Sequence, residues 1–189
     1  MNKYIFFSFV IIMSIITFNS HSLAEHEKKS ACYLDMDITT RTYNNADAVD
    51  IESSIISYAD DTIMVGIIAQ NVLNLDTFQV EVNYDPSVLS FIAAAEDLTY
   101  KGIKTILKKN GGSTIGFQAT EKKSGTINIS NTLIGDDPQI APEGTGLLAI
   151  IKFKVLSDKT TFLDLKNVFF VGSDKTEDPV NLLHGGKIN

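Results

Sequence analysis

The sequence predicts an all-β fold, an antiparallel β-sandwich of about nine strands. Three observations predict it. Short runs rich in β-forming residues recur roughly every 8–15 residues, turn residues separate these runs, and no helix–strand alternation indicates a parallel sheet. The 189 residues allow one domain of ordinary size, and a hydrophobic fraction of 44% supplies enough apolar material for its core.

Residues 1–24 have the pattern of a secretory signal peptide. Lys3 is the only charged residue before Glu25, and an apolar run over residues 4–18 leads to a small-x-small cleavage site that ends at Ala24. The apolar run of about fifteen residues is shorter than the ~20 that span a bilayer, so cleavage is favoured over a membrane anchor. We therefore expect export to the periplasm or the extracellular space, and no membrane span in the mature chain.

Residues 25–47 are polar and lack sustained periodicity, which predicts a flexible leader or linker. Asp35 and Asp37 lie in this segment, but two carboxylates without further oxygen ligands do not make a metal site. Cys32 is the only cysteine of the chain, so an internal disulfide is excluded. A crosslink between chains through Cys32 stays open, whereas the residues before it do not fit a lipid-modified cysteine.

The chain is acidic, with a formal net charge of −7 that becomes −8 once residues 1–24 are removed. Nucleic acid and anionic membranes are therefore poor partners, and neutral or locally basic proteins are better ones. Four lysines form the one basic concentration, and a solvated face of a short amphipathic segment is favoured over a docking patch for them. These lysines are Lys101, Lys104, Lys108 and Lys109.

The domain is expected over residues 48–189 and opens with two β-rich runs, 49–56 and 62–70. The run 77–84 is the clearest strand, because apolar and polar residues alternate in it until Asp85-Pro86 stops the ladder. Its inward row is expected to be Phe78, Val80, Val82 and Tyr84. Its outward row is expected to be Thr77, Gln79, Glu81 and Asn83, where a partner could bind.

The second half of the domain continues with strands separated by turns. A short helix is allowed between residues 93 and 109, where apolar residues recur at helical spacing before Gly111-Gly112. Strands are expected at 88–91, 114–119, 126–130, 147–156 and 187–188, and a pair of strands is expected within 162–171. In the run 147–156 the inward phase is expected to hold Leu147, Ala149, Ile151, Phe153 and Val155. Leu148 and Ile150 fall on the outward phase, either as an apolar binding patch or as residues buried under a loop.

The residues expected of an enzyme are not brought together by any motif. The three histidines are His21, His26 and His184, so a three-histidine metal site is excluded once the signal is removed. Carboxylates are numerous, but most fall in expected turns, and no pair can be placed across a cleft. We therefore expect that the protein is not an enzyme and that it needs no cofactor. A structural calcium ion stays open for the loops at 136–137 and 174–178, which lack the ligand spacing of a known calcium loop.

Four blocks in order resemble one family, the bacterial cohesin domains of cellulosome scaffolds. The blocks are NVLNLDTFQVEVNYDPSVLSF at 71–91, GTINIS at 125–130, GTGLLAIIKFKVL at 144–156 and GGKIN at 185–189. The resemblance implies a nine-stranded sandwich of jelly-roll topology. It also implies a non-catalytic role in extracellular assembly linked to polysaccharide breakdown, with a dockerin as partner. A dockerin is a small calcium-dependent helical module.

In this family the strand that ends in Tyr-Asp-Pro supplies outward polar contacts to dockerin. The resemblance assigns these contacts to Thr77 and Gln79, with Glu81 and Asn83 further along the same strand. Well-studied enzyme-docking cohesins carry Asn and Asp at the first two positions, so this chain keeps hydrogen-bonding groups there but loses a charge.

Two other functions compete with dockerin binding. One is a carbohydrate-binding or adhesive sandwich of the cell surface, with polysaccharide as partner. The absence of tryptophan and the expected inward orientation of most Phe and Tyr residues count against it. The other is a structural protein of the envelope that is crosslinked through Cys32.

Overall fold

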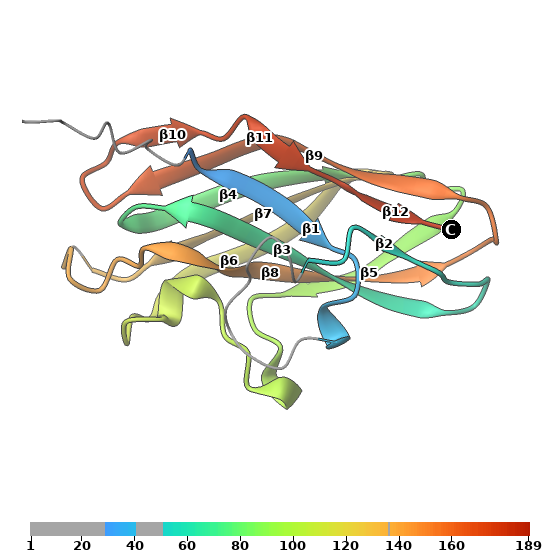
Figure 1. Cartoon of the computed structure of the whole chain (residues 1–189), viewed down its shortest axis with the longest axis horizontal. Helices are drawn as coiled ribbons and strands as arrows, with labels where there is room; N and C mark the ends of the chain where they lie inside the picture. Colours follow the sequence, from blue (N-terminus) through green and yellow to red (C-terminus); the bar gives the residue numbers. More distant parts are fainter. Residues whose placement is uncertain (1–28, 41–50, 136) are drawn as a thin grey trace, which may run out of the picture.

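The computed structural model describes residues 29–40, 51–135 and 137–189. These residues form two packed β-sheets (Figure 1), which confirms the predicted all-β sandwich with the jelly-roll arrangement. The predicted signal peptide at 1–24 lies outside the described residues. No helix among the described residues is long and apolar enough to cross a membrane.

The first sheet has the strand order β11-β1-β3-β8-β5. Its centre is the antiparallel pair of β3 and β8, while β1 lies antiparallel to β3 and parallel to β11. Its strands are β1 Ala31–Asp35, β3 Thr62–Val72, β5 Leu89–Ala95, β8 Gly144–Val155 and β11 Leu182–His184.

The second sheet has the order β2-β12-β9-β4-β7-β6, and β10 also pairs with β9. β12 is parallel to β2, so the sheets are mixed rather than purely antiparallel. The described residues form twelve strands instead of about nine, because β1 lies in the expected linker and β10 and β11, of three residues each, are too short to show a period in the sequence. The pair of strands expected over 162–171 is wrong, since β9 is one continuous strand there. The strands of this sheet are β2 Ser54–Ile55, β4 Leu75–Asn83, β6 Thr114–Lys123, β7 Thr126–Leu133, β9 Thr161–Gly172, β10 Glu177–Pro179 and β12 Gly186–Ile188.

The main core lies between the two sheets and follows from strand alternation. Phe78 on β4 and Ile127 on β7 are fully buried, as the sequence predicts, and Phe153 on β8 meets them from the other sheet. The ring of Tyr84 packs edge-on against Phe153 with 5.1 Å between ring centroids. The inward row of the predicted strand 77–84 is therefore confirmed.

Strand β1 contradicts part of the flexible leader predicted over 25–47. Residues 31–35 pair with both β3 and β11, and the side chain of Cys32 is completely buried in the main core. Burial raises the pKa of the Cys32 thiol and keeps it away from other molecules, so the proposed crosslink through a flexible Cys32 is wrong for the folded chain. Five strand residues are too few to give a sustained period, which explains the error.

A β-bulge changes the inward phase of β8. The register shifts between Ile67 and Ile68 on β3, so Leu148 enters the main core and Leu147 faces a second, smaller cluster. The expectation that Leu147 points into the main core is therefore wrong. Ile150 belongs to the second cluster and is only 4% exposed, so burial under a loop is confirmed over an apolar binding patch.

The loop that covers this second cluster replaces the predicted short helix. β5 continues to Ala95, and only two 3-10 turns follow, η3 Thr99–Lys101 and η4 Ile106–Lys108. Gly102 ends the first turn with a φ of 70°, which a right-handed helix cannot continue. Leu98 and Ile103 from this loop pack on the cluster.

Candidate docking surface

The outer face of strands β6, β7, β4 and β9 is a continuous four-strand surface, on the side of the sheet away from the main core (Figure 1). The predicted partner-binding residues lie along its middle on β4. Gln79 is exposed, and the other three are half-buried, whereas the residues between them are fully buried. The structure thus brings all four into one outward row, namely Thr77, Gln79, Glu81 and Asn83.

Strand register extends each of these residues into a row across the sheet. In the order β6, β7, β4, β9, the first row is Ile115, Thr132, Thr77 and Val171. The second row is Gln118, Ser130, Gln79 and Phe169. The third row is Thr120, Asn128, Glu81 and Lys166. The fourth row is Lys123, Thr126, Asn83 and Asp164. We call these four rows the docking face.

The first two rows contain no charged residue. Hydroxyl and amide side chains occupy the two central strands, and the hydroxyl of Thr77 donates to the hydroxyl of Thr132 at 3.2 Å. Three of the four flanking positions are apolar, with Ile115 61% and Phe169 39% exposed, and the fourth is Gln118 on β6. Exposed large apolar residues beside a polar strip are typical of a protein-binding surface.

The third and fourth rows carry the charges of the docking face. Lys166 lies opposite Glu81 in the register, and the side-chain amide of Asn167 donates to the Glu81 carboxylate at 3.2 Å. The register shift between Gln79 and Glu81 accommodates this extra residue, and Asn167 takes up the strain with a φ of 46°. The bulge therefore separates an uncharged half of the docking face from a charged half.

The exposed aromatic residues of β9 are missing from the sequence prediction, which expected most Phe residues to face inward. Phe162 is 58% exposed and Phe169 is 39% exposed, so these two rings are exceptions to that expectation. The sequence does contain a signal for one of them. Phe169 and Phe170 are adjacent in a strand, and adjacent strand residues point to opposite faces, so one ring must face outward.

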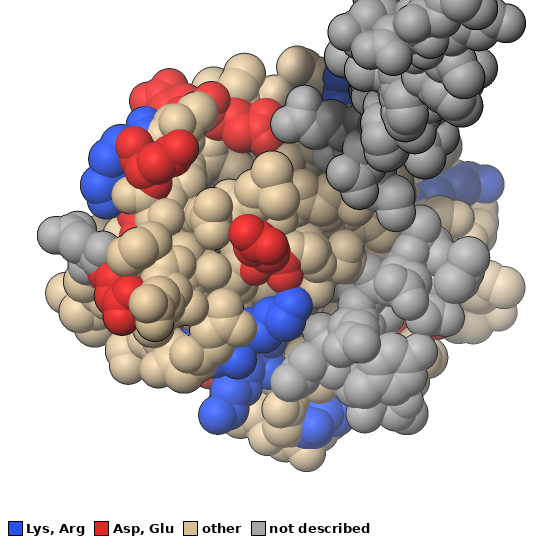
Figure 2. All heavy atoms as spheres, turned by 60° about the vertical axis from the view of Figure 1, so that its left-hand side comes forward, with Lys and Arg blue, Asp and Glu red and all other residues tan. Residues whose placement is uncertain are grey.

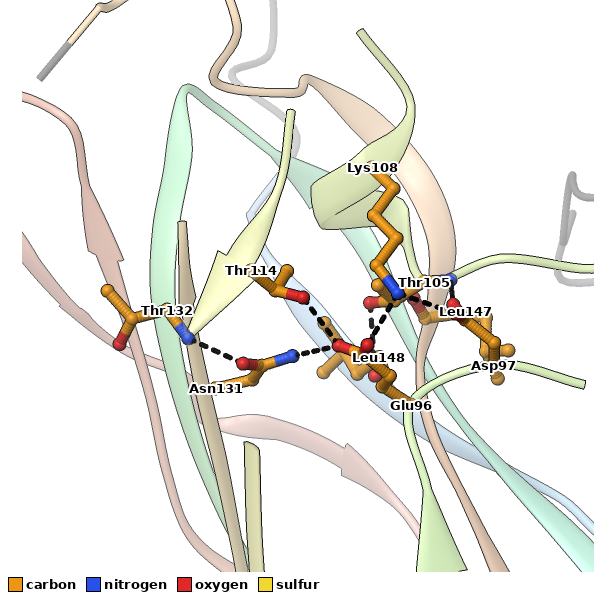
Figure 3. Close-up of polar contacts among 9 residues, drawn as sticks. All are labelled: Glu96, Asp97, Thr105, Lys108, Thr114, Asn131, Thr132, Leu147 and Leu148. Carbon is orange, nitrogen blue, oxygen red and sulfur yellow. Dashed lines mark hydrogen bonds and ion pairs between the residues drawn. The ribbon is translucent and has the colours of Figure 1, made fainter. Parts of the chain in front are cut away.

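A polar network fixes β6 and β7 from the side opposite the docking face (Figure 3). The Glu96 carboxylate accepts hydrogen bonds from Lys108 Nζ at 2.5 Å, Thr114 Oγ1 at 2.7 Å and Asn131 Nδ2 at 2.7 Å. Thr114 and Asn131 directly precede Ile115 and Thr132, the two residues of the first row on these strands. The network therefore sets the position of that row.

The same network reaches the other sheet through Asp97. Lys108 Nζ lies 2.5 Å from Asp97 Oδ2, and Asp97 Oδ1 accepts the backbone N–H of Thr105 at 2.8 Å. The Thr105 hydroxyl in turn donates to the Leu148 carbonyl of β8 at 3.1 Å (Figure 3). The segment between β5 and β6 is thus held to both sheets by polar contacts.

The ionisation of Glu96 and Lys108 follows from these contacts. Desolvation raises the pKa of Glu96, but the hydrogen bonds from Lys108, Thr114 and Asn131 outweigh it and leave the pKa below its usual value. Desolvation likewise lowers the pKa of Lys108, but its bonds to Asp97 and Glu96 outweigh it and raise the pKa overall. Both groups are therefore charged around neutral pH.

The basic concentration predicted from four lysines is not a single docking patch. Lys108 is held by two carboxylates, and Lys109 Nζ donates to the Glu143 carbonyl at 2.8 Å. On the side of the molecule in view in Figure 2, basic side chains form small groups beside acidic ones, and most of the surface is neither. This distribution favours the structural explanation of the lysines.

Metal-binding groups are sparse in the part of the chain that the structure describes. No group of three or more His, Cys, Asp or Glu side chains within residues 29–40, 51–135 and 137–189 could hold a metal ion. Asp137 and Asp174 each accept the backbone N–H two residues on, from Gln139 and Thr176 at 2.9 Å. Each hydrogen bond uses one oxygen of the carboxylate, and Asp136 lies outside the described residues. These contacts do not test the structural calcium ion that the sequence left open.

Comparison with known proteins gives matches among solved structures alone, since no protein-family model and no curated protein sequence matches the chain. The second type II cohesin module of the cellulosomal adaptor ScaA scaffoldin from Acetivibrio cellulolyticus has a TM-score of 0.60 and 19% identity, over 86% of this chain and 97% of that one.

Two further cohesin structures with lower sequence identity have the same fold. A chain of the type I cohesin–dockerin complex Coh-OlpA-Doc918 from Clostridium thermocellum has a TM-score of 0.60 and 13% identity, over 86% of this chain and 99% of that one. A non-cellulosomal cohesin from the archaeon Archaeoglobus fulgidus has a TM-score of 0.56 and 12% identity, over 85% and 90% of the two chains. The protein therefore has the cohesin-domain fold that its sequence motifs indicated.

Proposed function

We propose that this protein is a non-catalytic binding module of cohesin type, which holds a dockerin-type protein on the docking face. The observation that carries the proposal is the outward row of β4 on an open four-strand surface, flanked by the exposed side chains of Ile115 and Phe169. The cohesin fold supports it, because one of the similar structures is a cohesin–dockerin complex. Fold alone does not fix function, so the argument depends on this surface.

The side chains away from the docking face support a non-catalytic role. A surface hollow of about 500 Å³ is lined by the stacked rings of Tyr33 and His184, whose centroids lie 4.1 Å apart. Its remaining described lining is apolar, small or hydroxyl-bearing, with no carboxylate or cysteine to work with the histidine. The buried thiol of Cys32 is no nucleophile either.

The wider role in our proposal is extracellular assembly linked to polysaccharide breakdown. Its support is the signal-peptide pattern at 1–24 and the resemblance to cellulosomal cohesins. Nucleic acid is not a partner in this proposal, because the chain carries a formal net charge of −7.

Calorimetric titration with a panel of type I and type II dockerin modules, in calcium and in EDTA, tests the proposal. We expect calcium-dependent binding of at least one module. The double substitution Gln79→Arg with Glu81→Lys should weaken it at least about tenfold, because both changes place cations in the middle of the docking face. Lys152→Glu, an exposed change on the other sheet, should leave affinity unaltered. Absence of binding across the panel would contradict the proposal.

A carbohydrate-binding role is the second candidate, and one observation favours it. Phe162 and Phe169 present exposed rings on the outer side of β9, and sugars stack on such rings. Affinity electrophoresis in gels containing cellulose, xylan or chitin distinguishes the two functions. Retardation that Phe169→Ala abolishes would favour the carbohydrate, whereas unaltered migration in all three gels would remove this candidate.

A further inference from the structure

We infer that the surface hollow beside Tyr33 and His184 is a binding site for one unit of a neutral carbohydrate, which stacks on the paired rings. The hollow is lined by residues of β1, β11 and the segment 51–53, whereas the docking face belongs to β6, β7, β4 and β9. Occupation of the hollow leaves the docking face free, so this inference goes beyond the proposed function.

The hollow lies where two segments meet along one edge of β1. The register of β11 with β1 ends at Tyr33, which lies opposite His184. Further along β1, the backbone N–H of Met36 donates to the Glu52 carbonyl at 2.8 Å, so the next partner of this edge comes from the segment before β2. Leu34 lies between these two contacts and lines the hollow. The hollow is therefore built by strand pairing on both of its sides.

The paired rings form one wall of the hollow. Cys32 and Leu34 belong to the main core, so strand alternation turns Tyr33 to the outer side of the sheet. His184 is the register partner of Tyr33, and the two ring planes are 6° apart with 4.1 Å between their centroids. Tyr33 is half-buried and His184 is exposed, so the imidazole ring is accessible to a ligand. Sugar rings pack their C–H faces on such flat side chains.

The remaining lining fits an uncharged ligand with many hydroxyl groups. Leu183 and Ile51 supply apolar contacts, while Ser53 and Tyr33 carry hydroxyl groups that donate and accept hydrogen bonds. No Asp, Glu, Lys or Arg is among the described residues that line the hollow. A pyranose unit combines an apolar C–H face with a rim of hydroxyl groups, which matches this lining better than a charged ligand or an apolar peptide side chain does.

The size of the hollow agrees with a small ligand. Its volume of about 500 Å³ lies within the range of about 300–1,000 Å³ that is typical of small-molecule sites. Because it lies at the surface, a unit within a longer polysaccharide can enter it as well as a chain end. Phe162 and Phe169 of β9 do not line it, so this site differs from the exposed rings that favour the second candidate function.

Nuclear magnetic resonance titration of the isotope-labelled protein with short oligosaccharides tests the inference. The neutral probes are cellotetraose, xylotetraose and chitotetraose, and the charged probe is tetragalacturonic acid. We expect at least one neutral probe, and not the charged one, to shift the backbone amides of Tyr33, Leu183 and His184. His184→Ala should weaken this binding at least about tenfold, whereas His184→Phe, which keeps a ring, should weaken it less than about threefold.

Tyr58→Ala and Phe169→Ala are the matched controls, because each removes an exposed ring outside the hollow, and both should leave the affinity unchanged. Unshifted amides of the hollow with every neutral probe would overturn the inference, as would a preference for the charged probe. Binding that His184→Ala leaves intact, or that Phe169→Ala abolishes, would also overturn it. Titration with dockerin modules tests the proposed function separately, and a failure there does not change the result expected at the hollow.

Discussion

Replacement of Glu96 by alanine tests the polar network that fixes β6 and β7. The Glu96 carboxylate accepts three side-chain hydrogen bonds, and its side chain is 25% exposed, so water can replace only part of what is lost. Asn131 is 1% exposed and would keep a buried amide without this acceptor, which costs about 1–2 kcal/mol.

The other two contacts contribute less to the free energy of unfolding. In the Glu96→Ala variant, Lys108 keeps its ion pair with Asp97, in which Nζ lies 2.5 Å from Oδ2. Loss of the partly exposed ion pair with Glu96 therefore costs about 0.5 kcal/mol. Thr114 is half-buried and can turn to water, at a cost of about 0.5–1 kcal/mol. Together we expect Glu96→Ala to lower the free energy of unfolding by about 2–3.5 kcal/mol, or the melting temperature by roughly 4–14 °C.

Urea unfolding at equilibrium measures this loss, with Glu177→Ala on exposed β10 as the control. The control should change stability by less than about 0.5 kcal/mol. An equal, small loss for both variants would refute the reasoning, because it would mean that the network does not contribute to stability.

The pH dependence gives an independent check of the same network. The folded-state pKa of Glu96 lies below the ordinary value of 4.5, so its contribution is complete above pH 4.5 and is lost as pH falls through the folded pKa. The pKa of Lys108 is raised from 10.5, so its contribution is complete below that pH and is lost above it. The stability difference between wild type and Glu96→Ala should therefore be constant from pH 5 to pH 10 and shrink in acid. A difference that grows below pH 4.5 would contradict this account.

Three further predictions concern other parts of the fold. The Cys32 thiol should react with a thiol reagent only after unfolding, since it is fully buried; fast labelling of the native protein would show that β1 is not packed. Gly186→Ala should destabilise the protein by about 1–3 kcal/mol, because its Cβ would overlap the sulfur of buried Met36, whereas Glu177→Ala on exposed β10 should change stability by less than about 0.5 kcal/mol; equal urea midpoints would exclude the close packing of Met36 against β12. EDTA should leave the melting temperature of the isolated protein within about 1 °C, because no group of three or more His, Cys, Asp or Glu side chains among the described residues could hold a metal ion; a larger fall would show a structural cation.

Long strands with one buried face were predictable from the sequence, and short or irregular ones were not. The strand 77–84 has four apolar residues at a period of two, so both its existence and its outward row were found. β1 is also buried but has only five residues, and β11 has three, so neither gives a recognisable period. The position of β1 depends on pairing with β3, and that of β11 on pairing with β1, which is distant in the sequence.

The docking face was only half predictable for a similar reason. The β4 row follows from alternation within one strand, but its neighbours on β6, β7 and β9 follow from register, which the sequence does not specify. The β8 bulge moved Leu147 out of the main core and Leu148 into it, and no residue pattern marks that shift. The exposure of Phe169 was accessible from the Phe169-Phe170 pair, whereas that of Ile115 depends on where the bulge at Gly116 falls.

Nuclear magnetic resonance titration of the isotope-labelled protein with a dockerin module tests the central claim most directly. The docking-face account predicts that the perturbed backbone amides lie on β6, β7, β4 and β9, with the largest changes at Thr77, Gln79 and Phe169. Amides of β3 and β8, which form the centre of the other sheet, should keep their positions. Perturbations centred on β3 and β8, or none on β4, would contradict the assignment of this surface.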